Sequence, residues 1–499
     1  MLFNDGSVIR MMKMTLNHIK NVDKGSIEFD ESRRLAKDKS EEPINYHGLG
    51  GVLGIYGQNG SGKTAIIDCL FLLKSIAFGF PLKSDNRFLY LPKQGSSDSS
   101  VEYSFLLIRN HHKFNLKYTI SLYSDEPDVN SLEFHTHILN ESFSVESLDS
   151  KEKYPMIFLS KDNNDIDRMF SDDESFTVAK VLNITKKSND FIQSLSDLLA
   201  RKKVDYLEDR SFLFDSVFTK VLGNSENSNA GFISEMIELL KTQVCKNLYC
   251  YDTRNDALGT MGCGTLVGTA MNMETNGNSV VGTFPIGIEG AFDIPSDTLK
   301  LYQNLLEQIN VVVGGFVPGF KAEYRTIGVP HMSKDGQREN TTIEMVRTDN
   351  GLLLPIIAES NGIRKFINLA SAIICVYNNP SAWLAIDEFD SGVFENLLGQ
   401  ILEVMTERGK GQIVFTSHNL RPLEVINHKN LYFTTMNPEN RYVKLQYIKA
   451  TNNVRDFYLR VLKVGGQKEK MCSETEASQI VSCLFKGGKL LKQVVNHVD

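Results

Sequence analysis

Apolar residues recur along the chain in three patterns, and each pattern predicts a different kind of element. Short runs that are apolar throughout are typical of buried strands, and alternation of apolar and polar residues predicts strands with one exposed face. Apolar residues three or four positions apart predict helices. Short apolar runs mark 51–56, 382–386 and 412–416; alternation marks 8–29, 101–108 and 117–122; helical spacing marks 178–203, 212–222, 232–248 and 298–313.

The C-terminal half alternates strands and helices, which is typical of a parallel α/β sheet. Strands are expected at 316–325, 342–347 and 352–357, and the turn at 348–351 joins the last two as a hairpin. Helices are expected at 359–377, 394–408, 454–462 and 474–485. The predicted fold class is therefore α/β, with a mixed parallel sheet, an antiparallel subdomain and a helical insertion.

Polar stretches separate these elements. Residues 33–43 and 81–100 are rich in charged and small polar side chains, and we interpret both as solvated loops. His111 and His112 fall between two predicted strands, where a solvated turn is expected rather than a metal site. The segment Gly259–Gly287 leaves two interpretations open: a mobile segment that contacts a partner, or an ordered loop packed on its own domain.

Composition describes an ordinary globular protein of two or three domains, with 499 residues, 41% hydrophobic and 23% charged. No stretch of about 20 apolar residues predicts a membrane span. The N-terminus lacks a secretion signal, and the seven cysteines are scattered without a C-x-x-C pair. We therefore expect a cytoplasmic protein without a membrane partner. The net charge of −7 does not favour nucleic-acid binding.

One stretch predicts a phosphate-binding loop, and it reads Gly57-Gln58-Asn59-Gly60-Ser61-Gly62-Lys63-Thr64. An apolar strand precedes it and a helix-forming segment follows it. Glycines allow backbone N–H groups to surround a phosphate, and the N-terminus of the helix adds partial positive charge. Lys63 is then expected to reach the β- and γ-phosphates of ATP, and Thr64 to hold Mg²⁺. The alternative is a glycine-rich surface turn.

Two further strand ends carry candidate catalytic side chains. The apolar strand 383–386 ends in Asp387 and Glu388. Asp387 is expected to complete the Mg²⁺ shell with Thr64, and Glu388 to orient or deprotonate the attacking water. His418 follows the next strand and is expected to sense or position the γ-phosphate. The alternatives are acids that cap a strand and a structural histidine.

The order of these motifs resembles the head of ABC-type ATPases. Ser360 and Gly362 form a Ser-x-Gly element at the start of a predicted helix, between the phosphate loop and the acid pair. In that family this element completes the site of the opposite subunit. Glu359 and Asn361 depart from the transporter pattern L-S-G-G-Q, which favours heads of the chromosome-maintenance, break-repair and OLD-type group. Residues 16–21 also resemble the L-x-N-F-K motif near the N-terminus of proteins in that group.

The resemblance covers residues 8–120 and 342–444, and it implies ATP, Mg²⁺ and assembly as a homodimer or higher homo-oligomer. It places the family's D-loop at 390–392 and its Q-loop glutamine near Gln94. We predict two parts of the head at 1–160 and 321–447, a helical insertion at 161–320 and a helical tail at 448–499. No apolar strand followed by acids comes after His418, so the nuclease of OLD-type proteins is not expected here.

The tail also resembles stand-alone ATPase subunits of bacterial antiphage systems of the Septu and PARIS type, through residues 455–460 and 465–467. This implies an ATPase that controls a separate effector, a nuclease or toxin, with DNA or a phage-derived molecule as the trigger. An alternative is a repair or chromosome-maintenance ATPase that acts directly on duplex DNA. The energising subunit of a transporter and a catalytically silent nucleotide site are further alternatives.

Overall fold

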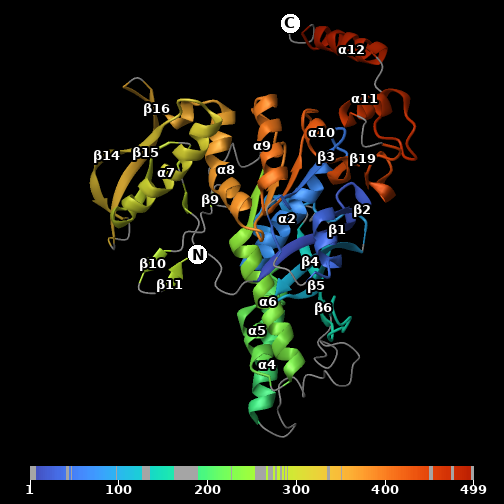
Figure 1. The fold of residues 1–499 in the computed structure, drawn as a ribbon, viewed down its shortest axis with the longest axis vertical. Coiled ribbons are helices and arrows are strands. Elements are labelled where there is room, and N and C mark those ends of the chain that lie inside the picture. Colours follow the sequence, from blue (N-terminus) through green and yellow to red (C-terminus); the bar gives the residue numbers. More distant parts are fainter. Residues whose placement is uncertain are drawn as a thin grey trace.

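The computed structural model describes residues 7–40, 44–46, 48–96, 98–125, 135–161, 189–225, 227–252, 266–267, 273–275, 278–280, 284–285, 287–288, 290–333, 336, 338–349, 351–448, 453–473 and 477–495. Gly259–Gly287 and the first part of the helix predicted at 178–203 therefore fall largely outside the described residues. Figure 1 shows a central body, a helical part below it and a second small sheet at one side.

A mostly parallel sheet forms the centre of the body, in the strand order β20-β19-β3-β18-β17-β8. Its strands are short, and nearly every residue in them is buried, as expected for strands covered on both faces. The carboxyl ends of the parallel strands lie at one edge of the sheet. The strands are β3 (Gly51–Tyr56), β8 (Leu248–Tyr251), β17 (Trp383–Ile386), β18 (Gln412–Thr416), β19 (Leu431–Thr434) and β20 (Tyr442–Val443).

Helices cover both faces of this sheet. Helix α2 (Lys63–Phe78) packs on one face with α6 (Ser228–Asn247), and α8 (Asn361–Asn378) and α9 (Glu395–Arg408) cover the other. Helix α2 is buried nearly all round because a second sheet closes over it. The Tyr103 hydroxyl of that sheet donates to the Cys69 carbonyl of α2.

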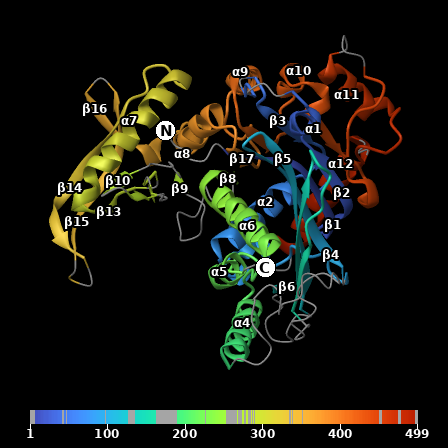
Figure 2. The same cartoon turned by 60° about the horizontal axis from the view of Figure 1, so that its bottom comes forward.

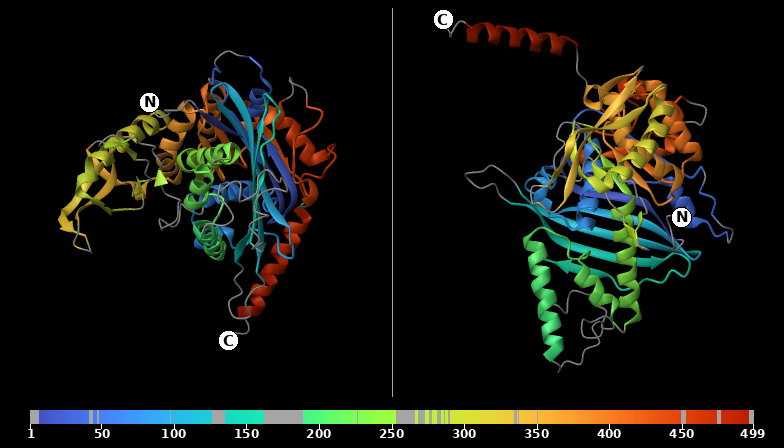
Figure 3. Two further views of the ribbon diagram at one scale, coloured as in Figure 1. Left: turned by 90° about the horizontal axis from the view of Figure 1, so that it is seen from below. Right: turned by 90° about the vertical axis from the view of Figure 1, so that its left-hand side faces the viewer.

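The second sheet is antiparallel, in the order β2-β1-β4-β5-β6-β7, and Figure 3 (right) shows it broadside. The turn between β4 and β5 contains Asn110 and His111, both with positive φ, and the side chains of His111 and His112 are exposed. The expectation of a solvated turn at this pair is confirmed. The strands are β1 (Val8–Ile19), β2 (Val22–Glu28), β4 (Ser99–Arg109), β5 (His112–Ser124), β6 (Thr136–Ser147) and β7 (Ile157–Ser160).

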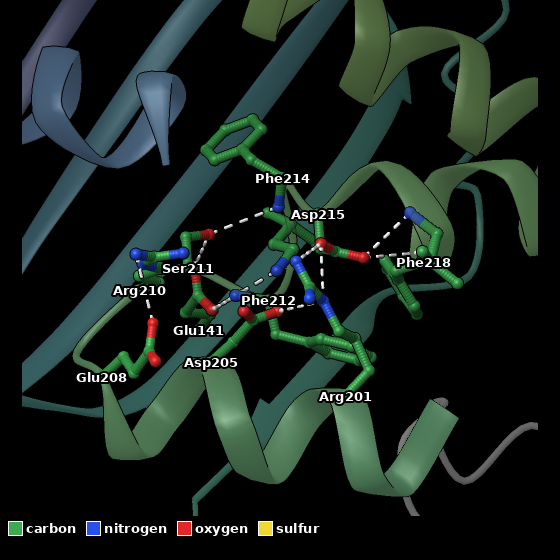
Figure 4. Close-up of polar contacts among 12 residues, drawn as sticks. Glu141, Arg201, Asp205, Glu208, Arg210, Ser211, Phe212, Phe214, Asp215 and Phe218 are labelled. Atoms are coloured by element: carbon green, nitrogen blue, oxygen red, sulfur yellow. Dashed lines mark hydrogen bonds and ion pairs between the residues drawn. The ribbon is translucent and has the colours of Figure 1, made fainter. Parts of the chain in front are cut away.

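A buried carboxylate fixes the helical part to this antiparallel sheet (Figure 4). Glu141 of β6 accepts hydrogen bonds from the hydroxyls of Tyr118, Tyr206 and Ser211 and from the N–H groups of the next two residues. Burial raises the pKa of Glu141, and the bonds from Ser211 and Tyr118 oppose that rise. The clamp therefore holds the junction between α4 (Asn189–Leu207) and α5 (Ser216–Gly223) on the sheet.

A small antiparallel sheet lies on the other side of the molecule from the large antiparallel sheet (Figure 2). Strand β15 (Glu339–Asp349) pairs with β13 (Phe292–Pro295), β14 (Ala322–Met332) and β16 (Leu352–Pro355), and helix α7 (Leu299–Phe316) packs against it. The hairpin predicted at 348–351 is confirmed by the pairing of β15 with β16. Shorter strands are β9 (Leu266–Val267), β10 (Met273–Thr275), β11 (Asn278–Val280) and β12 (Phe284–Pro285).

The chain closes with α10 (Pro422–Val425), α11 (Val454–Val464) and α12 (Ala477–Val495). Helix α12 stands apart from the body in Figures 1 and 3. Among the described helices, none combines the length and apolar character needed to span a membrane. The predicted α/β fold class, with a mixed parallel sheet, an antiparallel subdomain and a helical insertion, is confirmed.

Two local predictions are wrong. The segment 33–43 was expected to be a loop, but α1 (Asp30–Lys37) begins ahead of it and buries Ser32 and Leu35. The middle of the chain was expected to be helical, but β8 follows α6 directly and pairs with β17 at the edge of the parallel sheet. The domain boundaries at 160/161, 320/321 and 447/448 stay predictions.

Candidate nucleotide site

Strand β3 ends at Tyr56, and the next six residues form a loop that leads into α2. Gly57 passes so close to β19 that a Cβ on it would lie 1.6 Å from the Thr434 hydroxyl oxygen. Gly62 is the N-cap of α2 with a φ of +94°, a conformation that favours glycine. The local sequence therefore fixes both the close approach of the loop to the sheet and its sharp entry into the helix.

Neighbouring strands hold this loop from outside. The Tyr442 hydroxyl donates to the Gly62 carbonyl at 2.6 Å, and the Asn21 amide donates to the Gly60 carbonyl. The Ser61 hydroxyl lies 2.6 Å from that of Thr434, and its side chain is buried. The Ser61 hydroxyl therefore anchors the loop to β19, and the prediction that Ser61 binds the nucleotide stays a prediction.

Lys63 lies at the base of the loop and folds back over it. Its Nζ donates to the carbonyls of Gly57 at 2.9 Å and Gln58 at 3.0 Å. Burial lowers the pKa of Lys63, and the nearby charges of Asp387 and Glu388 oppose that effect. The first N–H groups of α2 have no acceptor within the helix, so they and the Lys63 ammonium suit an anion.

Thr64 connects the loop to the strand that was predicted to carry the acids. Its hydroxyl donates to the Asp387 carboxylate, at 3.0 Å from Oδ2 and 3.3 Å from Oδ1. Thr416 at the end of β18 also donates to Oδ1, at 2.5 Å. Within the described ranges no group of three His, Cys, Asp or Glu residues could hold a metal ion. A hydroxyl and one carboxylate still fit Mg²⁺, which keeps several waters and binds phosphate oxygens.

Glu388 follows Asp387 and is exposed at the same edge of the sheet. Its φ is +47°, in the left-handed region that non-glycine residues seldom adopt. Its N–H donates to the Thr416 hydroxyl at 2.8 Å. The backbone therefore turns the Glu388 side chain away from the sheet and toward solvent, where a water molecule can reach it.

His418 also lies at this edge, in the turn after β18. Its side chain is exposed, and its N–H donates to the Asp390 carboxylate at 3.1 Å. The N–H of Asn419 donates to the same oxygen at 3.0 Å. Asp390 therefore fixes the backbone that carries His418, while the role of His418 toward a γ-phosphate stays a prediction.

Ser360 and Gly362 lie elsewhere, at the start of α8. Ser360 is the exposed N-cap of this helix, and its hydroxyl accepts from the N–H of Ile363 at 3.4 Å. Gly362 is packed on the turn after β17, where an added Cβ would lie 2.1 Å from the Gly392 carbonyl oxygen. Among the described residues no recorded contact joins Ser360 or Gly362 to the phosphate loop of the same chain.

Comparisons with known proteins agree with this assignment of the loop. A family model described as an AAA domain (AAA_23) matches residues 13–215, which include the phosphate loop and α2. No curated protein matches the chain. The nucleotide-binding part is a P-loop ATPase fold.

Several solved structures are similar to this chain at low sequence identity. The Smc head domain from Pyrococcus furiosus, bound to the C-terminal domain of ScpA, is 12% identical, with a TM-score of 0.36; the alignment covers 91% of this chain and 99% of that one. The SMC head domain from Thermotoga maritima is 13% identical, with a TM-score of 0.34 and 88% and 99% covered. The recombination mediator protein RecF is 12% identical, with a TM-score of 0.34 and 89% and 100% covered.

The sequence did not identify all residues at this edge of the sheet. Thr416 contacts both Asp387 and Glu388. Its position as a polar residue at the end of a predicted parallel strand could have indicated this role. Asp252 directly follows β8, next to Asp387, which follows the neighbouring strand and donates its N–H to the Tyr251 carbonyl. Gln94 was expected in the Q-loop, but it is exposed in the turn before β4, and no contact with the phosphate loop is recorded in the described part of the chain.

Proposed function

We propose that this protein is a Mg²⁺-dependent ATPase. The contact between Thr64 and Asp387 carries the proposal, because it joins a phosphate loop to an acidic strand end at the point where Mg²⁺ would lie. Lys63 would bind the β- and γ-phosphates, and Thr64 and Asp387 would hold the metal ion, which supplies charge stabilisation for phosphoryl transfer. Glu388 would accept a proton from the attacking water, and His418 would contact the γ-phosphate.

We propose that two copies share each site, in a homodimer or a higher homo-oligomer. Ser360 is exposed at the N-terminus of α8, so its helix can meet a phosphate that another copy holds. Two apolar side chains near this helix start are exposed: Ile357 precedes Ser360 by three positions and is 51% exposed, and Phe394 is 73% exposed. Phe394 follows the turn on which Gly362 packs. A second copy that covers Ser360 would remove both apolar side chains from water.

Phosphate release by the purified protein tests the ATPase. The wild type is expected to hydrolyse ATP when Mg²⁺ is present and to stop when the metal is chelated. Lys63→Ala should abolish turnover and weaken ATP binding. Lys74→Ala, at a buried lysine in the same helix, is the matched control. An intact, folded protein that neither binds nor hydrolyses ATP would refute the proposal.

We further propose that ATP turnover controls a separate effector, a nuclease or toxin, in defence against phages. Helix α12 supports a protein partner, because Val481, Leu484 and Phe485 are each more than 60% exposed on it. The test is whether the product of a neighbouring gene co-purifies with the full chain, and whether phage-derived molecules change ATP turnover of that complex. Strong stimulation by plain duplex DNA without a partner would favour the repair alternative instead.

A further inference from the structure

Glu388 has an unfavourable backbone conformation, which neighbouring groups must stabilise. Its φ of +47° lies where a side chain crowds the following carbonyl, so the conformation persists only when surrounding groups hold it. One of these groups is the Thr416 hydroxyl, which accepts from the Glu388 N–H at 2.8 Å. The other group contacts the carbonyl of Glu388 and belongs to helix α8.

That second group is the ammonium of Lys365. Its Nζ donates to the Glu388 carbonyl at 2.6 Å and to the Ser391 carbonyl at 3.3 Å. Lys365 lies in α8, and only 2% of its surface is exposed. Lysines are rarely this buried, and a buried ammonium is tolerated only where acceptors surround it. Lys365 therefore binds the turn after β17 from the interior of the protein.

Lys365 also belongs to the helix that starts at Ser360. Gly362 packs against Gly392, so the first turns of α8 and the turn after β17 contact each other at two places. Close packing without a side chain at Gly362 leaves little freedom between them. A displacement at the N-terminus of α8 is therefore passed to the backbone of Glu388 through Lys365.

We propose that Lys365 is a positioning residue for ATP hydrolysis, which sets the orientation of Glu388 according to the position of α8. The inference rests on the proposed function: Ser360 contacts the nucleotide of a second copy, and that contact moves α8. Lys365 then links nucleotide occupancy of the partner's site to the orientation of Glu388 in its own chain. Its substitution should lower the rate of hydrolysis without weakening ATP binding.

The chain offers a matched control for a role in stability alone. Lys74 of α2 is also a buried helical lysine, with its Nζ 5.9 Å from the ring centre of Tyr249 in β8. Lys365 lies 6.0 Å from the ring centre of Tyr251 in the same strand. Methionine keeps most of the length of either side chain and removes the ammonium. Both substitutions therefore remove a buried ammonium beside a tyrosine ring of β8, and only that of Lys365 removes a contact with Glu388.

The experiment measures kcat, KM and the thermal midpoint of the purified full chain. Lys365→Met is expected to lower kcat at least tenfold, with KM and ATP affinity within about twofold of the wild type. Lys74→Met should also lower the thermal midpoint and keep its kcat. A kcat for Lys365→Met within twofold of that for Lys74→Met would overturn the proposal. A wild type without turnover would refute the ATPase itself, which is a separate outcome.

A second variant covers the case in which Lys365→Met does not fold. Lys365→Arg keeps the charge and the donors but carries a longer, planar group, which would displace the Glu388 carbonyl. The expected result is a reduced kcat at unchanged KM, and wild-type kcat would overturn the proposal. Ser360→Ala should also lower kcat by a smaller factor in the Lys365→Met variant than in the wild type, because both residues act on the orientation of Glu388.

Discussion

Thr64 and Asp387 lie 323 positions apart in the chain, and the hydroxyl of one lies 3.0 Å from the carboxylate of the other. The contact exists because β3 and β17 run parallel on either side of β18, so their carboxyl ends reach the same edge of the sheet. Ligands of α/β sheets bind outside this edge. The pair therefore defines where the metal and the phosphates of ATP would lie.

The first prediction concerns this pair. Thr64→Val removes the hydroxyl and keeps the shape of the side chain, so the protein should fold while one metal ligand is lost. We expect turnover to fall about a hundredfold, on the order of 3 kcal/mol in the barrier, and half-maximal activity to need more Mg²⁺. The measurement is a Mg²⁺ titration of phosphate release. Thr219→Val, at a buried threonine of α5, is the control, and equal titrations for the two variants would contradict the metal role.

The second prediction concerns Glu388. Glu388→Gln keeps the size of the side chain and removes the group that can accept a proton, so ATP should bind and remain intact. We expect a stable ATP-bound assembly larger than the apo protein, seen by light scattering with ATP and absent with ADP. Glu395→Gln, at an exposed acid in the first turn of α9, should hydrolyse ATP as the wild type does. Normal turnover by Glu388→Gln would exclude Glu388 as the base.

The third prediction concerns the support of the phosphate loop. Tyr442→Phe removes the hydrogen bond to the Gly62 carbonyl, which is worth about 1 kcal/mol. The loop should then be less ordered before binding, and the Kd for ATP should rise about fivefold. Tyr103→Phe removes a similar bond, to the Cys69 carbonyl farther along α2, so it should lower stability alone. Calorimetric titration with ATP separates the two, and equal affinities would show that the loop needs no such support.

The fourth prediction concerns pH and the acidic residues beside the Glu141 clamp. Burial, reinforced by the charge of Asp215, raises the pKa of Asp205 to about 6, while Arg201 opposes the rise. The folded protein therefore binds this proton more tightly than the unfolded chain does. This contribution to stability is present at low pH and is lost as the pH rises through the window from about 4 to about 6.

Asp205→Asn removes the ionising group at that position. The variant should lose this part of the decline in stability between pH 4 and 6, and at pH 7 it should be more stable by on the order of 2 kcal/mol. Thermal midpoints measured from pH 4 to 7.5 test this, with Asp297→Asn at an exposed carboxylate as control. Parallel pH profiles for the wild type and Asp205→Asn would contradict it.

Sequence patterns predicted the parts of the fold that local chemistry determines. The strand 412–416 occurs with the bounds expected of it, and the phosphate loop lies between β3 and α2 as predicted. Both depend on residues within one short window: apolar runs, and glycines that permit a tight loop. The positions of Asp387 and Glu388 at a strand end could be predicted for the same reason.

Apart from the pairing of Thr64 with Asp387, which the two motifs imply, contacts between distant segments could not be predicted. Strand β8 follows Asn247 without a turn residue, so its apolar residues look like the last turn of α6, and only pairing with β17 makes it a strand. The hydroxyl of Ser61 faces Thr434, which is 373 positions away. Lys365 likewise gave no signal, because a lysine in a predicted helix is ordinarily exposed, and its acceptors belong to another element.

The central claim is that two copies build each ATP site, and a mixing experiment tests it most directly. Lys63→Ala disables the phosphate loop, and Ser360→Arg blocks the element that would close on a partner's site, so each variant alone should be inactive. In a mixed dimer, one site combines the intact loop of one copy with the intact Ser360 of the other.

The measurement is ATP turnover of an equimolar mixture after subunit exchange. Half of the dimers would then be mixed with one intact site each, so we expect about a quarter of the wild-type rate. A mixture no more active than the two variants measured separately would contradict a shared site and place the whole reaction within one chain.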